Sequence, residues 1–197
     1  NNICMFSFSL TKNSDILSQW RGYAETGGVS IGFSTKELKK TADAHGFKLA
    51  KCIYEEKLID EYLENFFNSI NMTEIEKRNS QSEETMEKTI HFALIRHFFE
   101  LFARFKHNSF EEEDEWRIIS DLGGVIKQSK EYKVRQGLIP YYELPINLKN
   151  DIKNITTSPG SESIRKAFAI RKLFASQDIS EIKVIISNSP FRNYKSL

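Results

Sequence analysis

The chain has 197 residues, 40% hydrophobic and 28% charged, which is usual for a globular protein long enough to bury a core. Its net charge of +1 gives no global field that would draw it to nucleic acid or to a membrane surface. No apolar run approaches the length of a membrane span and no signal-peptide pattern is present, so we expect a cytoplasmic protein without a membrane partner. Cys4 and Cys52 both lie in apolar, strand-like runs, which predicts buried free thiols in a reducing compartment.

The first part of the chain alternates strand and helix patterns. Apolar runs predict strands at 3–9, 29–33 and 47–54. Asn13, Ser14 and Asp15 offer N-cap chemistry for a short helix through Trp20. A second helix is expected over 36–45, ended by Gly46. Because the chain starts without methionine and enters a strand at once, we expect that an N-terminal segment is missing from it.

From residue 55 the apolar residues recur at helical spacing, over 55–70 and again over 86–107. We expect an antiparallel helix pair, packed on the sheet or inserted into it, at about 55–107. His91 and His97 fall in this region without cysteine or carboxylate partners at ligand spacing, so no metal site is predicted.

The next stretch places five consecutive carboxylates directly before Trp116 and a β-branched run. A strand that begins near Glu113 puts Glu113, Glu115 and Arg117 on one face, while Asp114 and Trp116 point to the other, toward a core. Two interpretations stay open. Arg117 can hold Glu115 ionised in a prepared site, or the acids form a solvated turn with one structural ion pair.

The remainder returns to strand patterns. We expect a hairpin from 132–135 and 138–144, a strand at 152–156, a helix at 162–175 capped by Ser161, and a last strand at 182–187. Strands at both ends with helices between predict an α+β fold: one domain over 1–197 with a mixed, mostly antiparallel sheet and the two-helix insertion.

Two further groups of residues suit ligand binding. Trp20, Arg21 and Tyr23 precede a glycine turn and can form a stacking wall with a cationic edge for a nucleotide. The alternative is an aromatic anchor that packs a short helix on the sheet. A third set offers individually weak anion contacts or surface tyrosines: Arg135, Pro140, Tyr141, Tyr142 and Arg192.

Several motifs together resemble the bacterial family labelled domain of unknown function 2971. The matching stretches are LSQWRGYAETGGVSIGF, FKHNSFEEEDEWRII, VRQGLIPYYEL, ITTSPG and VIISNSPFR. The family's W-x-x-Y, K-x-x-x-F-x-x-E-x-E-[WY]-R and S-x-x-P-[FY]-R elements fall on Trp20, Tyr23, Lys106, Phe110, Glu113, Glu115, Trp116, Arg117, Ser187, Pro190, Phe191 and Arg192. The family's upstream asparagine-aspartate-proline element has no counterpart here. The resemblance implies relatedness and fold, and names no reaction.

One functional hypothesis is an ADP-ribosyltransferase-like enzyme with NAD as substrate. Such sites need a carboxylate beside the nicotinamide ribose to stabilise an oxocarbenium-like transition state. In one subclass a Ser-x-Ser strand precedes a Glu-x-Glu pair, and Ser7, Ser9, Glu113 and Glu115 occur here in that order. We expect Glu115 to face a cleft shared with Trp20, Tyr23 and Arg117, and Glu115→Gln to leave folding nearly unchanged.

The other hypothesis is a non-enzymatic domain of a bacterial stress or phage-defence system that binds a nucleotide, a nucleic-acid end or a protein. The acidic strand would then be structural. A metal-dependent nuclease is less favoured, because that chemistry uses Glu-x-Lys spacing and this strand has Glu115-x-Arg117.

Overall fold

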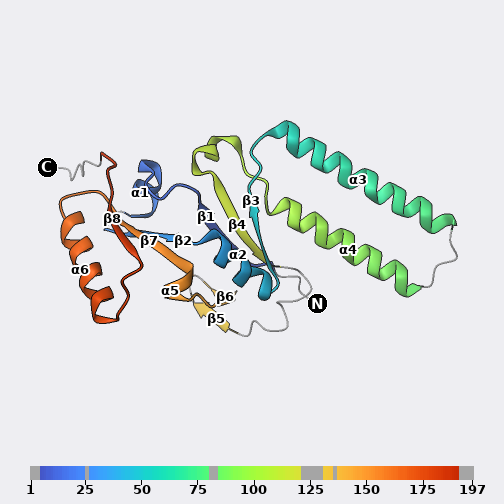
Figure 1. Cartoon of the computed structure of the whole chain (residues 1–197). Helices are drawn as coiled ribbons and strands as arrows, with labels where there is room; N and C mark the ends of the chain where they lie inside the picture. Colours follow the sequence, from blue (N-terminus) through green and yellow to red (C-terminus); the bar gives the residue numbers. More distant parts are fainter. Residues whose placement is uncertain (1–4, 25–26, 80–83, 121–130, 135–136, 191–197) are drawn as a thin grey trace. The chain divides into compact units, whose positions relative to one another are not determined.

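A computed structural model describes residues 5–24, 27–79, 84–120, 131–134 and 137–190, and has the expected α+β composition (Figure 1). The chain forms two compact units. Unit 1 comprises Asn1–Leu10 and Ala42–Glu143, and unit 2 comprises Thr11–Thr41 and Leu144–Leu197. Helix α2 (Thr35–Ala44) runs from one unit into the other. The units are described separately below, and a single domain over 1–197 stays a prediction.

Unit 1 contains a three-stranded sheet in the order β1 (Ser7–Thr11), β4 (Glu115–Ser120), β3 (Phe47–Lys51). β3 and β4 pair antiparallel, with Phe47 opposite Ser120. Beside β1, Ser120 donates its backbone N–H to Phe6 and accepts the Phe6 N–H on its hydroxyl. β4 is the middle strand, so its apolar residues are deeply buried, and Ile118 and Ile119 are each 2% exposed. Buried Cys52, just after β3, is a free thiol, and Cys4 lies outside the described residues.

The predicted helix pair is present as α3 (Glu56–Asn79) and α4 (Glu84–Phe102). Phe66 on α3 packs against the rings of His97 and Phe98 on α4, at centroid distances of 5.9 and 5.4 Å. The prediction that the second helix continues to residue 107 is wrong. The helix ends at Phe102. Beyond it, the Arg104 carbonyl accepts a hydrogen bond from the Ile53 N–H, and the Lys106 N–H donates to the Ile53 carbonyl.

The predicted hairpin is also present in unit 1. β5 (Glu131–Val134) pairs antiparallel with β6 (Leu138–Tyr141), and Gly137 in the connection has a φ of 142°. Tyr142 packs on Phe47 at 5.0 Å between ring centroids. Arg135 lies outside the described residues.

Unit 2 has a second three-stranded sheet, in the order β2 (Val29–Phe33), β7 (Ile152–Thr157), β8 (Lys183–Ile186). β2 is antiparallel to β7, and β7 is parallel to β8. The parallel pair requires a crossover, which is α6 (Ser163–Ser176). The core of unit 2 lies between this sheet and α6. Its buried residues are Ile152, Ile155, Ile179 and Ile182, and the partly buried side chains that pack against them are Phe33, Ile170 and Phe174.

Two smaller helices complete unit 2: α1 (Leu17–Tyr23) and α5 (Leu148–Asp151), the latter capped by Asn147 and not predicted. Both predicted side-chain caps are wrong. The N-cap of α1 is Ile16 and that of α6 is Glu162, each without a side-chain cap bond. Gly46 does end α2, in the left-handed region with φ of 74°.

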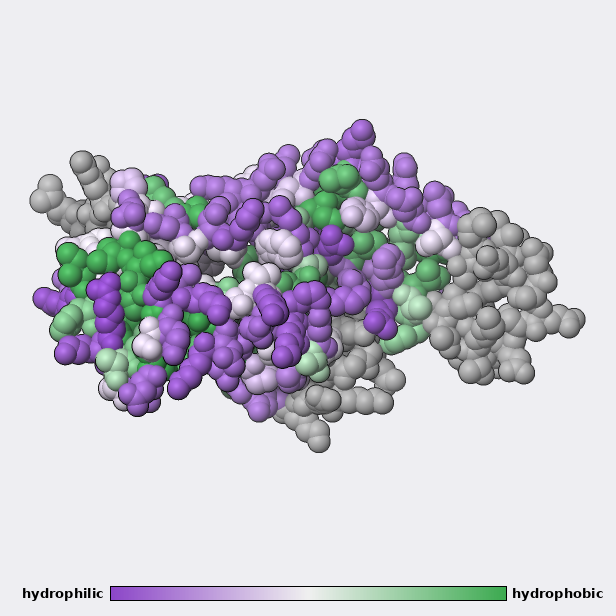
Figure 2. Space-filling view, viewed as in Figure 1, coloured by the Kyte–Doolittle hydropathy of each residue, from purple (hydrophilic) through white to green (hydrophobic). Residues whose placement is uncertain are grey.

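Apolar side chains are also exposed on α6, where Figure 2 shows a hydrophobic cluster. The exposed large hydrophobic residues on this helix are Ile164, Phe168 and Leu173. Within the described part of the chain, no helix has both the length and the hydropathy to cross a membrane.

Candidate functional site

The acidic stretch begins as a short helix rather than as a strand. Asn108–Glu113 form a 3₁₀ helix (η1), and Asp114 then adopts the left-handed conformation, with φ of 39°. This conformation is tolerated by aspartate and redirects the backbone, so β4 starts at Glu115 instead of near Glu113. The predicted grouping of Glu113, Glu115 and Arg117 on one side is retained, because Lys106 contacts both glutamates and Arg117 contacts Glu115.

Glu115 is a buried carboxylate, 3% exposed, with a partner for each oxygen. Its Oε1 accepts a 2.7 Å hydrogen bond from Arg117 Nε, and its Oε2 accepts one from Lys106 Nζ. The Ser9 side chain also forms a hydrogen bond with this carboxylate. Strands β1 and β4, which carry Ser9 and Glu115, are neighbours in the sheet. We call Ser9, Lys106, Glu113, Glu115 and Arg117 the Glu115 cluster.

Backbone and aromatic contacts hold the Glu115 cluster in place. The Glu115 N–H donates to the Tyr54 hydroxyl at 2.7 Å, and its C=O accepts from the Cys52 N–H at 2.9 Å. Arg117 Nη1 donates to the Ala103 carbonyl at 2.5 Å. Phe110 places its ring 4.9 Å from Lys106 Nζ. Such a cluster fixes the carboxylate in one rotamer.

The electrostatics of the cluster favour the charged forms of Glu115, Lys106 and Arg117. Burial raises the pKa of Glu115, but hydrogen bonds from Arg117, Lys106 and Ser9 outweigh it and lower the pKa to about 2. Burial lowers the pKa of Lys106, and the bonds to Glu113 and Glu115 raise it above its usual value. The hydrogen bond to Glu115 raises the pKa of Arg117. Glu115 is therefore an ionised, oriented carboxylate at neutral pH.

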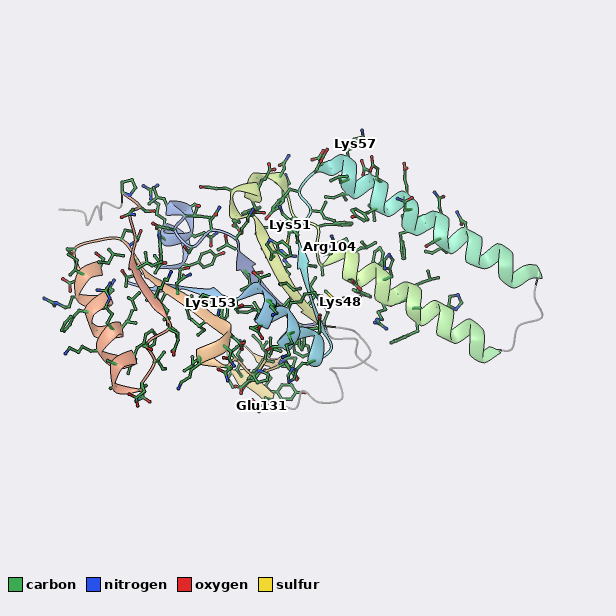
Figure 3. All side chains as sticks on the ribbon, in the orientation of Figure 1. Lys48, Lys51, Lys57, Arg104, Glu131 and Lys153 are labelled. Carbon is green, nitrogen blue, oxygen red and sulfur yellow. The ribbon has the colours of Figure 1, made fainter. Side chains whose placement is uncertain are left out.

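A hollow of about 410 Å³ opens beside this region, lined by Tyr54, Glu55, Glu56, Lys57, Asn108 and Glu111. Tyr54 lines this hollow, and its hydroxyl also accepts the hydrogen bond from the Glu115 N–H. Two lysines of β3, Lys48 and Lys51 (labelled in Figure 3), form ion pairs with Glu100 and Asp114, respectively. Among the described residues, no three or more His, Cys, Asp or Glu side chains are grouped so as to hold a metal ion.

The predicted aromatic wall belongs to unit 2. Trp20 is buried, 5% exposed, and its indole N–H donates to Asp15 Oδ1 at 2.6 Å, so it anchors α1 and presents no open stacking face. Arg21 is exposed and Tyr23 is 80% exposed. Because Glu115 belongs to unit 1, a cleft shared by Glu115, Trp20 and Tyr23 stays a prediction. Ser7 on β1 is exposed.

The sequence pattern predicts Asp15 as a helix cap, but in the structure its carboxylate is the centre of a hydrogen-bond network. It accepts hydrogen bonds from Trp20, from the Ser187 and Ser189 hydroxyls, and from the Asn188 N–H. The sequence did contain a signal for this network, because two donors come from the family elements: Trp20 from W-x-x-Y and Ser187 from S-x-x-P. Arg192 of the closing element lies outside the described residues.

The chain matches a family model. No curated protein and no solved structure matches the sequence. The model of the family described as "Protein of unknown function (DUF2971)" matches residues 19–118, a span that contains Trp20 and Tyr23 as well as Lys106, Glu115 and Arg117. The chain belongs to this DUF2971 family.

Proposed function

We propose that the chain is an ADP-ribosyltransferase-like enzyme that uses NAD and that Glu115 is its catalytic carboxylate. The observation that carries this proposal is that β1, which holds the Ser-x-Ser segment, and β4, which begins at Glu115, are neighbours in one sheet although more than one hundred positions separate them. Ser9 is close enough to the Glu115 carboxylate to lower its pKa. The same two elements are the ones that the chemistry requires side by side.

The reaction would break the bond between C1′ of the nicotinamide ribose and the nicotinamide nitrogen. Nicotinamide leaves as a neutral molecule with the bonding electrons, a hydroxyl, amine or water of the acceptor bonds to C1′, and the acceptor's proton is released. Positive charge develops on the ribose in the transition state, so an ionised carboxylate beside it stabilises that state. Glu115 meets this need because its pKa is lowered to about 2.

In the proposed complex, a ribose hydroxyl would take the place of Lys106 on Glu115. Its ammonium donates to both Glu113 and Glu115 and its side chain is 17% exposed, compared with 4% for Glu115. On binding, a 2′-hydroxyl would replace Lys106 as a donor to Glu115, and Lys106 would remain paired with the more exposed Glu113. Arg117 and Ser9 would keep the Glu115 carboxylate oriented throughout.

The test is nicotinamide release from NAD by the purified chain, measured by chromatography. We expect release by the wild type, loss of about a hundredfold or more with Glu115→Gln, and a smaller loss with Ser9→Ala, as is usual when an electrostatic group is removed. Glu111→Gln is the matched control, because Glu111 is exposed. Circular dichroism checks that each variant is folded. A wild type that releases no nicotinamide, or equal rates for Glu115→Gln and Glu111→Gln, would contradict the proposal.

A second candidate is a non-enzymatic domain that binds a nucleotide, a nucleic acid or a protein. It is favoured by the burial of Glu115 and by the charged partners on both of its oxygens, which suit a structural ion cluster. Saturable binding of NAD without nicotinamide release, unaltered by Ser9→Ala, would support this candidate over the enzyme.

A further inference from the structure

A second hollow opens in unit 2, where helix α6 and strand β8 lie side by side (Figure 1). Its volume is about 440 Å³, within the range of about 300–1,000 Å³ that is usual for small-molecule sites. Residues of three consecutive segments line it: the last turns of α6, the loop that follows, and the first half of β8. All of its lining residues belong to unit 2.

Half of the lining of this hollow is apolar. The residues are Phe174, Ile179, Ile182 and Val184, which we call the apolar floor. Ile179 and Ile182 are buried members of the core of unit 2, so their positions are fixed by packing. Phe174 and Val184 are half-buried, and part of each side chain remains exposed. An apolar group of a ligand would leave water on entering this place, which favours binding.

Two opposite charges line the same hollow. Arg171 and Asp178 are both exposed. Arg171 Nη2 donates to the Val184 carbonyl at 2.9 Å, which directs the side chain from α6 toward β8 and leaves the other N–H groups of the guanidinium as donors. Within the part of the chain that the structure describes, neither Arg171 nor Asp178 forms an ion pair. Both charges are therefore open to a ligand.

Asp178 is unfavourable for the local structure. It follows Gln177, the C-cap of α6, and has a φ of 51°, in the left-handed region where glycine is usual after a helix. Its carboxylate also lies at the C-terminal end of a helix, where the helix dipole disfavours negative charge. Glycine would remove both costs. A carboxylate kept at such a position, beside an apolar hollow, has a reason to be there if it binds a cation of a ligand.

We propose that this hollow binds a free hydrophobic amino acid, with its carboxylate at Arg171, its ammonium at Asp178 and its side chain on the apolar floor. Guanidinium and carboxylate groups each form charge-assisted hydrogen bonds with a group of opposite charge, and a free amino acid carries both. A segment inside a peptide would present neutral amides at these two positions, so charge complementarity favours the free amino acid. The site does not rest on the function proposed for Glu115, which belongs to unit 1.

The probes are L-phenylalanine, L-leucine and three analogues, each titrated calorimetrically into the purified chain. L-phenylalaninamide lacks the carboxylate, 3-phenylpropionate lacks the ammonium, and L-alanine lacks the large apolar group. We expect L-phenylalanine or L-leucine to bind, and each analogue to bind about tenfold more weakly or worse, because it lacks one of the three contacts. Failure of both amino acids to bind would overturn the site. Equal affinity for L-phenylalanine and its amide would overturn the assignment of Arg171, and equal affinity for 3-phenylpropionate that of Asp178.

Substitutions on α6 test the guanidinium and the space. Arg171→Met should weaken the amino acid about tenfold or more, since it removes a charge-assisted hydrogen bond. Lys172→Met is its matched control, because the neighbouring Lys172 lies over the exposed Phe168 ring, 5.6 Å from its centroid. Ala175→Leu should fill the hollow and abolish binding, whereas Ala169→Leu, at an exposed position of the same helix outside the hollow, should not. Thermal melts check that all variants fold.

Asp178→Gly separates binding from folding. Glycine suits the left-handed backbone and removes the negative charge from the end of α6, so this variant should melt about 2–4 °C above the wild type. It should nevertheless bind the amino acid about tenfold more weakly. Unchanged affinity in Asp178→Gly or in Arg171→Met would overturn the proposal. A lower melting temperature of Asp178→Gly would also overturn it, because the carboxylate would then serve the fold.

Discussion

The hydroxyl of Ser187 donates a 2.5 Å hydrogen bond to the carboxylate of Asp15, 172 positions earlier in the chain. The same carboxylate accepts from Trp20 Nε1 at 2.6 Å and from Ser189 Oγ at 2.9 Å. Asp15 therefore ties helix α1 to the segment after β8, and it supplies the one partner that the buried Trp20 indole needs. This explains why unit 2 can be assembled from the segments Thr11–Thr41 and Leu144–Leu197, which are far apart in the sequence.

Replacing Asp15 should destabilise the protein. Burial raises the pKa of Asp15, yet the bonds from Ser187 and Trp20 outweigh it and hold the pKa below its usual value. Asp15→Ala removes these bonds and leaves the Trp20 N–H unpaired, so the free energy of unfolding should fall by about 2–3 kcal/mol. Urea unfolding measures it. Ser14→Ala is the control, because the exposed Ser14 does not cap α1 and its removal should cost nothing measurable.

Stability should fall in acid because of Glu115. Its pKa is about 2 in the folded protein and 4.5 as an isolated side chain, so the folded state binds its proton less readily. The contribution of Glu115 to stability is thus complete above about pH 4.5 and is lost as the pH falls from there toward 2. Urea unfolding at a series of pH values should show this acid limb, and Glu115→Gln should flatten it. An unchanged limb in that variant would mean that other carboxylates cause it.

The structure also corrects the expectation that Glu115→Gln leaves folding nearly unchanged. The substitution leaves Lys106 and Arg117 facing a neutral amide in a buried place, and breaking one side of a buried ion pair costs about 3–5 kcal/mol. We expect a clear drop in melting temperature at pH 7, and none for the exposed Glu111→Gln. Equal melting temperatures would indicate that water reaches the cluster.

Most elements of the fold were predictable because their signals are local. Each signal acts within a few residues: alternation over 29–33 predicts a strand, helical spacing after residue 55 predicts a helix, and Gly46 predicts the end of α2. The start of β4 was misplaced by two residues, because the left-handed Asp114 has no clear signal in a run of acids. Asp15 was read as a helix cap because capping chemistry is local, whereas its partners Ser187 and Ser189 lie at the other end of the chain.

The Glu115 cluster was predictable only in part. The strand period grouped Glu113 with Glu115 and Arg117. Ser9 and Tyr54 join them because β1 and β3 are neighbours of β4, with Tyr54 three residues beyond the end of β3, and sequence spacing does not encode that strand order. The two-unit organisation had no compositional signal, because each unit combines two separate segments and no Gly-rich or Pro-rich linker separates them.

The burial of β4 side chains gives a further prediction. The strand pattern predicts that Trp116 points toward a core, but in the structure it is half-buried, opposite the exposed Lys51 at the end of β3. Ile119 is 2% exposed in the middle of the sheet. Ile119→Ala should therefore cost about 2–5 kcal/mol and Trp116→Ala less, although tryptophan is the larger side chain. Thermal unfolding of the two variants gives the order, and a larger loss for Trp116→Ala would show that the indole is the true centre of this core.

Two glycines in unit 2 should respond to alanine in opposite directions. A Cβ on Gly32 would lie 2.5 Å from Asn154 Oδ1, so Gly32→Ala must displace the amide and should cost about 1–3 kcal/mol, the usual range for overpacking. Gly22 lies in α1, and a Cβ there would meet no atom within 4 Å, so Gly22→Ala should stabilise the protein by up to about 1 kcal/mol through helix propensity. Chemical unfolding of both variants measures the difference. Combining Gly32→Ala with Asn154→Ala should recover stability, because it removes the amide that the new methyl group strikes. No recovery would place the conflict in the backbone of β2 instead of the Asn154 side chain.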